Sequence, residues 1–451
     1  MSSGSARWTR PKLEPVAPGA RVTWLELFYD LVFAFAFIRV TLTAERSPGS
    51  LLRALLLVSL LWFLWTTFTT LGNFARGDEG VMPFACLIAV GATFIAALVL
   101  PYADGHHAHP SDYVFACCFI VVRALWVLVF WERVRRVPGL RPRWRVVIGP
   151  PAASAILLLA AATVPYVLTS HLFPARVVLL ALAVVVAYTA GTIFAFHELG
   201  RIATRHWTDR YAQIILIALG ESVIAVGTAR EPSENLVLTW PLLAGAAFGL
   251  SVISAIAFNY FDHHMADGEH ALRATHGSRQ TALARDAYIL LHLPMIIGIL
   301  LFSLGLDQVY TDIRNPVTPA AGHPSLDSVS LLYGGVFLYG VASLGFQRRT
   351  GQRLGWLEVA VRPPLLLAIP AVALLPAMYA VFLLAVYMVG ITTLRTVSTI
   401  PQRMRSRAVT RQRERRVEAA AEAHERAVQA AEADQPADPT GANVPGRGHR
   451  G

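Results

Sequence analysis

The sequence predicts an all-α membrane protein with about twelve transmembrane helices. Of its 451 residues, 55% are hydrophobic and only 15% are charged, whereas soluble globular proteins carry about 25% charged residues. The apolar residues form long runs separated by short polar loops. Such runs are long enough to cross a bilayer as helices, and they lack the short alternating segments of a transmembrane barrel.

Each run of about 20 apolar residues predicts one span. In chain order the predicted spans cover residues 22–44, 51–72, 82–102, 112–132, 146–168, 174–197, 208–228, 237–261, 284–304, 328–346, 356–375 and 377–396. Prolines interrupt the last two and predict broken helices or a tight hairpin there. These prolines are Pro363, Pro364, Pro370 and Pro376.

The arginines predict the orientation of the spans. The formal net charge is +10, and Lys12 is the only lysine. Arginines gather before the first span and in the fourth, sixth, eighth and tenth loops, whereas each odd-numbered loop holds two at most. By the positive-inside rule this places both termini in the cytoplasm and favours an even number of spans. The rule also explains the basic charge without a nucleic-acid partner.

Four regions follow from composition. Residues 1–21 form a polar cytoplasmic segment without a cleavable signal, and residues 22–400 form the transmembrane domain. Residues 401–433 are basic and then Ala/Glu-rich, which predicts a cytoplasmic helix, and residues 434–451 have the composition of a disordered tail. The basic part is a candidate site for anionic lipid, with a topology anchor as the alternative. Its candidate residues are Arg403, Arg405, Arg407 and Arg411.

Several ionisable residues fall inside predicted spans, where charges are costly and count as functional candidates. Glu26 and Asp30 lie one helical turn apart in the first span. At 1.5 Å per residue, Asp30, Arg123, Glu221 and His292 all lie roughly 12 to 17 Å from the cytoplasmic end of their spans. The shared depth predicts that Arg123 pairs with Asp30 or Glu221.

The ninth span adds two candidates beside His292. Arg285, Tyr288 and His292 occupy positions i, i+3 and i+7, which places them on one helical face. Two interpretations of the polar layer stay open. It is either a proton or substrate site, in which carboxylates beside His and Arg act as a relay, or an ion-pair network that only specifies helix packing.

The first and seventh spans both start in the cytoplasm and both carry a deep acid, which is compatible with a 6+6 repeat. Gly220 and Gly227 lie seven residues apart in the seventh span. They predict close helix packing, with a broken-helix site at Gly220 and Glu221 as the alternative.

No metal or cofactor site is predicted. The loop from Asp262 to His270 and the His106, His107 and His109 group are rich in possible ligands but lack a recognised ligand spacing. Nucleotide-binding and hydrolytic motifs are absent from the sequence, so no enzyme activity is expected. The three cysteines fall within apolar runs and indicate small buried side chains.

Three segments resemble the bacterial low temperature requirement protein A family, over roughly residues 20–400. They are Trp24-Leu-Glu26-Leu-Phe28-Tyr29-Asp30-Leu-Val-Phe, Arg210-Tyr211-(six residues)-Ala218-Leu-Gly220-Glu221-Ser222, and Ala284-Arg285-Asp286-Ala-Tyr288-Ile-Leu-Leu-His292-Leu-Pro294. The family has Phe at the position of Tyr29. It often has an acidic residue directly before the Arg-aromatic pair of the seventh span, and Asp209 occupies that position before Arg210 and Tyr211. The resemblance implies a multi-spanning inner-membrane protein and does not imply a mechanism.

The leading functional hypothesis is a secondary transporter or permease of the bacterial cytoplasmic membrane, with the polar layer as its site. Its expected partners are the lipid bilayer, anionic lipid and an unknown small molecule or ion. One alternative is a non-transport membrane protein that supports envelope function or cold adaptation. Another is a membrane-embedded enzyme acting on a lipid-soluble substrate, with Glu26, Asp30 or His292 in acid–base roles.

Overall fold

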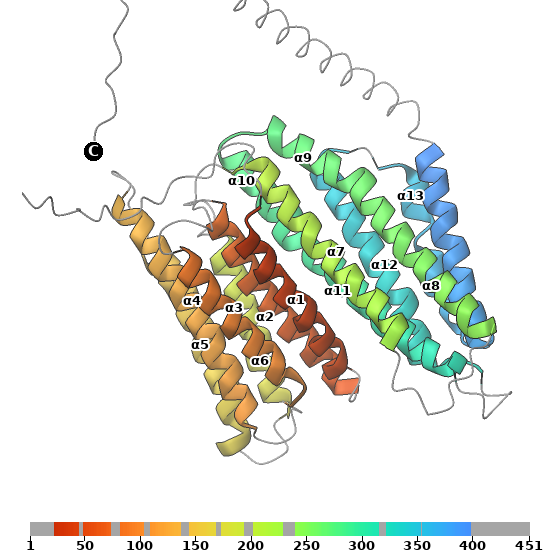
Figure 1. Cartoon of the computed structure of the whole chain (residues 1–451), viewed down its shortest axis with the longest axis horizontal. Coiled ribbons are helices and arrows are strands. Elements are labelled where there is room, and N and C mark those ends of the chain that lie inside the picture. Colours follow the sequence, from red (N-terminus) through yellow and green to blue (C-terminus); the bar gives the residue numbers. More distant parts are fainter. Residues whose placement is uncertain are drawn as a thin grey trace, which may run out of the picture. The chain divides into compact units, whose positions relative to one another are not determined.

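The computed structural model describes residues 22–44, 48–73, 82–102, 109–136, 144–167, 173–193, 202–228, 240–314, 322–352 and 354–397. Throughout these ranges the regular structure is helical (Figure 1). Contacts divide the chain into two units, Met1–Val389 and Gly390–Gly451. The first unit holds the described helices up to Val389. The predicted tail regions 401–433 and 434–451 lie outside the described residues.

The first six helices are α1 Trp24–Ala44, α2 Pro48–Gly72, α3 Met82–Val99, α4 Pro110–Arg136, α5 Trp144–Val167 and α6 Phe173–Ile193. A short 3-10 turn, η1 Leu100–Tyr102, extends α3. The next group comprises α7 Thr204–Thr228, α8 Trp240–Asn259, α9 Met265–Ala274, α10 Ser278–Leu283, α11 Leu291–Arg314 and α12 Leu326–Arg349. Three short helices follow, α13 Trp356–Ala360, α14 Pro363–Leu367 and α15 Ile369–Val372, before a long helix over Ala377–Val397.

Ten helices among the described residues are long and apolar enough to cross a membrane. The prediction of many membrane-spanning helices is therefore confirmed, but the described residues do not show twelve uninterrupted spans. The sixth predicted span holds a shorter apolar helix, Ala175–Thr189. The eleventh, 356–375, is broken into α13, α14 and α15, because prolines lack the backbone N–H that continues a helix.

Two helices extend well beyond their predicted spans. The π-helical turn η4, Tyr260–His264, joins α8 to α9, so the predicted polar loop from Asp262 to His270 is helical instead. A second π-helical turn, η5 Ala284–Leu290, joins α10 to α11. No cluster of three or more potential metal ligands is found in the described part of the chain.

The glycine predictions for the seventh span were wrong. Helix α7 runs unbroken past Gly220, and a Cβ at Gly220 or Gly227 would meet open space. Close glycine packing occurs instead between α11 and α12. A Cβ on Gly298 would lie 2.7 Å from the Gly335 carbonyl oxygen, and one on Gly335 would overlap the Phe302 backbone. Small residues let membrane helices approach this closely.

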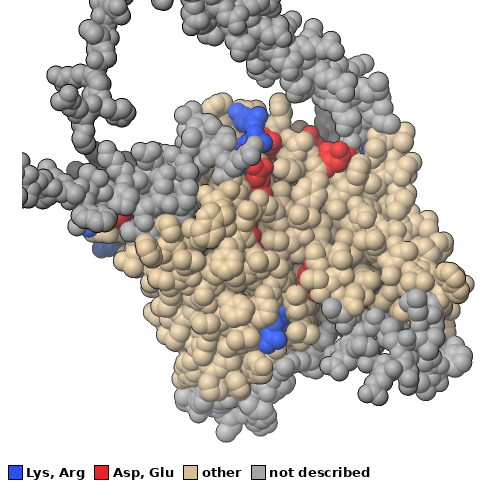
Figure 2. All heavy atoms as spheres, viewed as in Figure 1, with Lys and Arg blue, Asp and Glu red and all other residues tan. Residues whose placement is uncertain are grey.

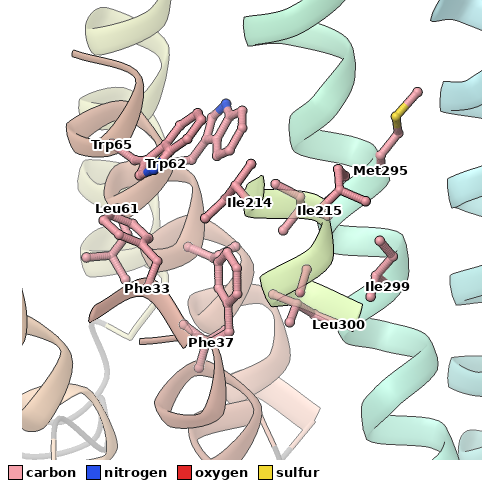
Figure 3. Packing of buried hydrophobic residues seen from close by; sticks show 14 of the residues in the cluster. Phe33, Phe37, Leu61, Trp62, Trp65, Ile214, Ile215, Met295, Ile299 and Leu300 are labelled. Carbon is pink, nitrogen blue, oxygen red and sulfur yellow. The ribbon is translucent and has the colours of Figure 1, made fainter. Parts of the chain in front are cut away.

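A continuous apolar core joins α1, α2, α7 and α11. Figure 3 shows Phe33 and Phe37 of α1 beside Leu61 and Trp62 of α2, with Ile214 and Ile215 of α7 facing Ile299 and Leu300 of α11. Many outward side chains are also large and apolar, such as Leu31 at 61% exposed. Figure 2 shows a face largely free of charged side chains. An apolar exterior is what a lipid-facing surface requires.

The contact between α11 and α12 predicts different outcomes for two adjacent glycines. Gly335→Ala should lower the free energy of unfolding by about 1–3 kcal/mol, because its methyl group has no room beside the Phe302 backbone. Gly334→Ala is the matched control, since a Cβ there meets open space. Unfolding by SDS titration in mixed micelles measures both. Equal effects of the two substitutions would contradict the packing described here.

Candidate functional site

Helices α1 and α7 lie side by side (Figure 1) and meet in a contact that we call the central seam. Three polar pairs cross it, namely Glu26–His206, Asp30–Arg210 and Thr41–Glu221. The members of every pair are 180 residues apart. A constant offset over several turns means that the two helices run parallel and in register.

The first pair joins the starts of the two helices. Thr23 and Glu26 form a reciprocal capping box at the start of α1, in which the Glu26 carboxylate accepts from the Thr23 backbone N–H at 2.9 Å. Both Glu26 oxygens also lie 3.1 Å from His206 Nε2. Gly72, at the end of α2, leaves the space that the carboxylate occupies. Glu26 therefore starts α1 and ties it to α7.

The second pair lies one turn deeper and is almost fully enclosed. Asp30 Oδ1 accepts from Arg210 Nη2 at 3.0 Å and from Trp65 Nε1 at 2.7 Å. Both charged side chains are 1% exposed. Arg210 also donates to Thr69 Oγ1 at 3.3 Å and lies over the Trp65 ring. Helix α2 thus supplies neutral partners to both members of the ion pair.

The ion pair does not use all of its hydrogen-bonding atoms. Asp30 Oδ2 and Arg210 Nε and Nη1 have no hydrogen-bond partner among the described residues. Buried polar atoms normally find protein or water partners. The pair therefore keeps hydrogen-bonding capacity that its direct contact does not use.

An apolar layer separates this pair from the third one. Phe33 and Phe37 of α1 are fully buried next to Ile214 of α7 in the layer shown in Figure 3. Beyond it, Thr41 Oγ1 donates to Glu221 Oε1 at 3.1 Å. The seam therefore has carboxylates on both sides of a packed apolar barrier.

A cluster of aromatic side chains, which we call the His292 cluster, lies where α7, η4, η5, α11 and α12 meet. It consists of Tyr211, Tyr260, Tyr288, His292 and Phe346. His292 Nε2 lies 2.8 Å from the Tyr260 hydroxyl, and Nδ1 lies 2.9 Å from the Ala287 carbonyl oxygen. These partners allow the neutral ring to donate from Nδ1 and accept at Nε2.

Aromatic rings connect the His292 cluster to the seam. The Tyr211 ring lies 5.0 Å from Trp65 and 5.1 Å from His292, centroid to centroid. Tyr211 directly follows Arg210 in α7. The two π-helical turns contribute Tyr260 and Tyr288 to the cluster, and such turns are frequent at functional sites.

A known protein family matches most of this chain. The family model described as bacterial low temperature requirement A protein (LtrA) matches residues 21–393. The chain belongs to this family. A similar protein is the uncharacterized protein RA0937 of Rhizobium meliloti (strain 1021), which is 25% identical over 325 residues, or 68% of this chain and 73% of the relative.

The three segments that resemble LtrA proteins come together in the structure. The first carries Glu26 and Asp30, and the second carries Arg210 and Glu221, so these two segments form the seam. The third segment supplies Tyr288 and His292, whose rings stack at 5.1 Å. The family membership predicted from these segments is thus confirmed.

The predicted partner of Arg123 was wrong. Arg123 donates to Thr67 Oγ1 at 2.7 Å and lies over the rings of Phe63 and Trp126. No ion pair of Arg123 is found within the described ranges. Thr67 and Phe63 point away from the seam toward α4, whereas Trp65 of the same helix points toward Asp30. Equal depth in the membrane therefore did not mean contact, because α2 lies between the two groups.

The grouping predicted for the ninth span holds only in part. Tyr288 and His292 stack, but Arg285 donates to Asp286 Oδ1 at 2.6 Å, and Asp286 also accepts from Arg349 at 3.0 Å. The prediction assumed α-helical geometry, whereas the π-helical turn η5 changes which side chains share a face. The lipid-binding candidates Arg403, Arg405, Arg407 and Arg411 lie outside the described residues.

The sequence interpretation missed three partners of the two acids that come from other helices. These are His206, Arg210 and Trp65. The sequence held one signal for the two basic partners, His206 and Arg210. His206 and Arg210 are four residues apart near the start of one apolar run, as Glu26 and Asp30 are in another. Trp65 gave no such signal, because an indole in an apolar run is ordinary.

Two buried arginines should respond differently to replacement by Met. Arg210→Met leaves the Asp30 carboxylate buried without its counter-charge and should cost about 3–5 kcal/mol of unfolding free energy. Arg123→Met removes a buried charge that has no carboxylate partner in the described part of the chain, so it should be neutral or stabilising. SDS titration in mixed micelles measures both variants. A larger loss for Arg123→Met than for Arg210→Met would contradict the assigned pairing.

Proposed function

We propose that this LtrA-family membrane protein is a secondary transporter or permease of the bacterial cytoplasmic membrane. The observation that carries the proposal is the pair Asp30–Arg210, a buried carboxylate and guanidinium at the contact of two membrane helices. Ionisable residues within spans are costly, and they commonly mark substrate paths and proton relays. The unused hydrogen-bonding atoms of this pair provide the polar contacts that a transported group needs.

The arrangement along the seam supports a proton-linked mechanism. Carboxylates occur on both sides of the layer formed by Phe33, Phe37 and Ile214. Each carboxylate can exchange protons with the water on its side of the closed apolar layer. Small movements of α1 against α7 would expose one carboxylate at a time to water. Asp30 and Glu221 are the proposed proton carriers, with Arg210 controlling the charge of Asp30.

The register of the seam supports the finer architecture that we propose. Parallel α1 and α7 at a constant offset of 180 residues are what two halves of a 6+6 repeat would place at their interface. The positive-inside pattern supports cytoplasmic termini. The proposed partners are the bilayer, a small molecule or ion, and anionic lipid at the arginines of residues 403–411.

One observation favours a second function. Asp30 and Arg210 are each only 1% exposed, and a dry ion pair can serve solely to specify how two helices pack. In that case the chain would be a non-transport membrane protein that supports envelope function or cold adaptation. The two functions predict different consequences of removing both charges.

A double substitution separates the two functions. In Asp30→Asn/Arg210→Gln both charges are lost together, so the fold avoids an unpaired buried charge and should persist. The purified protein would be reconstituted in liposomes with an internal pH indicator and screened with metabolite and ion mixtures under a pH gradient. We expect wild-type protein to couple proton movement to one of these solutes, and the folded double variant to lose this coupling.

Arg123→Met is the matched control, because it removes a buried arginine that lies off the seam. It should keep the solute-dependent proton flux. A folded double variant with wild-type flux would contradict the relay and leave the pair with a structural role. A wild-type protein that moves none of the screened solutes under any gradient would count against transport itself.

A further inference from the structure

A second buried charge cluster lies at the opposite end of the first helices. Helix α2 ends at Gly72 beside Glu26, and Arg53 lies about 28 Å back along its axis at 1.5 Å per residue. There Asp112 Oδ1 accepts from Arg53 Nη2 at 3.2 Å and also from Arg176 Nη2. The side chains of Arg53, Asp112 and Arg176 are 3%, 6% and 4% exposed, respectively. This cluster has no part in the seam.

Hydrogen-bonding capacity remains at Arg176. Its Nε and Nη1 atoms are buried and have no hydrogen-bond partner among the described residues. Arg176 lines a cavity of about 20 Å³ together with Asp112, Ser111 and apolar side chains of α2, α4, α5 and α6. A buried guanidinium with free donors at a cavity calls for an acceptor. The cavity can hold one small species.

The electrostatics of the cavity favour a negative ligand. Arg53, Asp112 and Arg176 each lie near the first turns of their helices α2, α4 and α6. Three positive helix ends therefore point toward the same region. The Asp112 carboxylate faces two guanidinium groups in this cluster. A small anion would accept the hydrogen bonds that Arg176 Nε and Nη1 can still donate.

The apolar lining of the cavity limits which anions can bind there. Most of the cavity wall is apolar, including Leu57, Phe115, Leu158 and Leu180. Removing a strongly hydrated or divalent anion from water into such a site costs more than removing a weakly hydrated monovalent one.

We propose that Arg176, with Arg53 and Asp112, forms a binding site for a small, weakly hydrated monovalent anion such as chloride or bromide. The anion accepts hydrogen bonds from Arg176 and stabilises the packing of α2, α4 and α6 at this end. Asp112 Oδ2 has no hydrogen-bond partner among the described residues and repels an anion that approaches it. The ligand therefore lies on the Arg176 side, and Asp112 limits its affinity.

The test is binding of radiolabelled chloride to the purified full chain in detergent, measured by scintillation proximity. Wild-type protein should show saturable binding to one site, displaced by bromide or nitrate and not by sulfate. Arg176→Gln should weaken binding by roughly tenfold or more, because it removes charge-assisted hydrogen bonds. Asp112→Asn should retain or strengthen binding, because it removes the repelling charge. Arg273→Gln, at an exposed arginine, is the matched control and should bind as wild type.

A measurement on the unaltered protein guards against misfolded variants. The melting temperature of wild-type protein should rise and level off as chloride replaces gluconate at constant ionic strength, since a ligand of the folded state stabilises it. Absence of saturable chloride binding to wild-type protein would overturn the proposal. So would unchanged affinity in Arg176→Gln. Loss of binding in a folded Asp112→Asn variant would also overturn it, because the proposed site predicts that Asp112 repels the anion.

Discussion

The ion pair between Asp30 and Arg210 is the interaction on which the arrangement of this molecule depends. A charge enclosed in a membrane protein is costly unless a partner neutralises it. Each of these two residues is 1% exposed, so each requires the other. Because Asp30 lies on α1 and Arg210 on α7, the pair holds together two helices that are far apart in the sequence and fixes their position along each other's axis.

Several neighbouring features serve that pair. The capping box that starts α1 places Glu26 against His206, one turn from Asp30. Helix α2 adds the indole of Trp65 and the hydroxyl of Thr69. Tyr211 then links the seam to the His292 cluster through ring contacts. The ion pair fixes the axial position of α1 relative to α7. The apolar side chains further along the two helices pack together and fill the rest of the contact.

Much of the fold followed from the sequence because apolar runs of about 20 residues have few alternatives to a membrane helix. The prolines at 363, 364, 370 and 376 also marked where helical structure breaks. The partners of buried charges did not follow, because depth along one helix says nothing of the direction in which a side chain points. Arg123 shows this, since α2 separates it from Asp30.

The same limit applies to glycines and local geometry. Gly220 and Gly227 had the spacing of a packing motif, yet the close contacts occur at Gly298 and Gly335. Which glycine faces a neighbour depends on the helix arrangement. The π-helical turn that separates Arg285 from His292 likewise changes a helical face without a clear mark in the sequence.

Asp30 and Arg210 should stabilise the fold only as a pair. A double-mutant cycle tests this, with unfolding free energies of wild type, Asp30→Asn, Arg210→Gln and the double variant measured by SDS titration. We expect each single substitution to destabilise the protein more than the double substitution does, which gives a large coupling energy. Additive effects, with the double variant as unstable as the sum of the two single variants, would contradict the account.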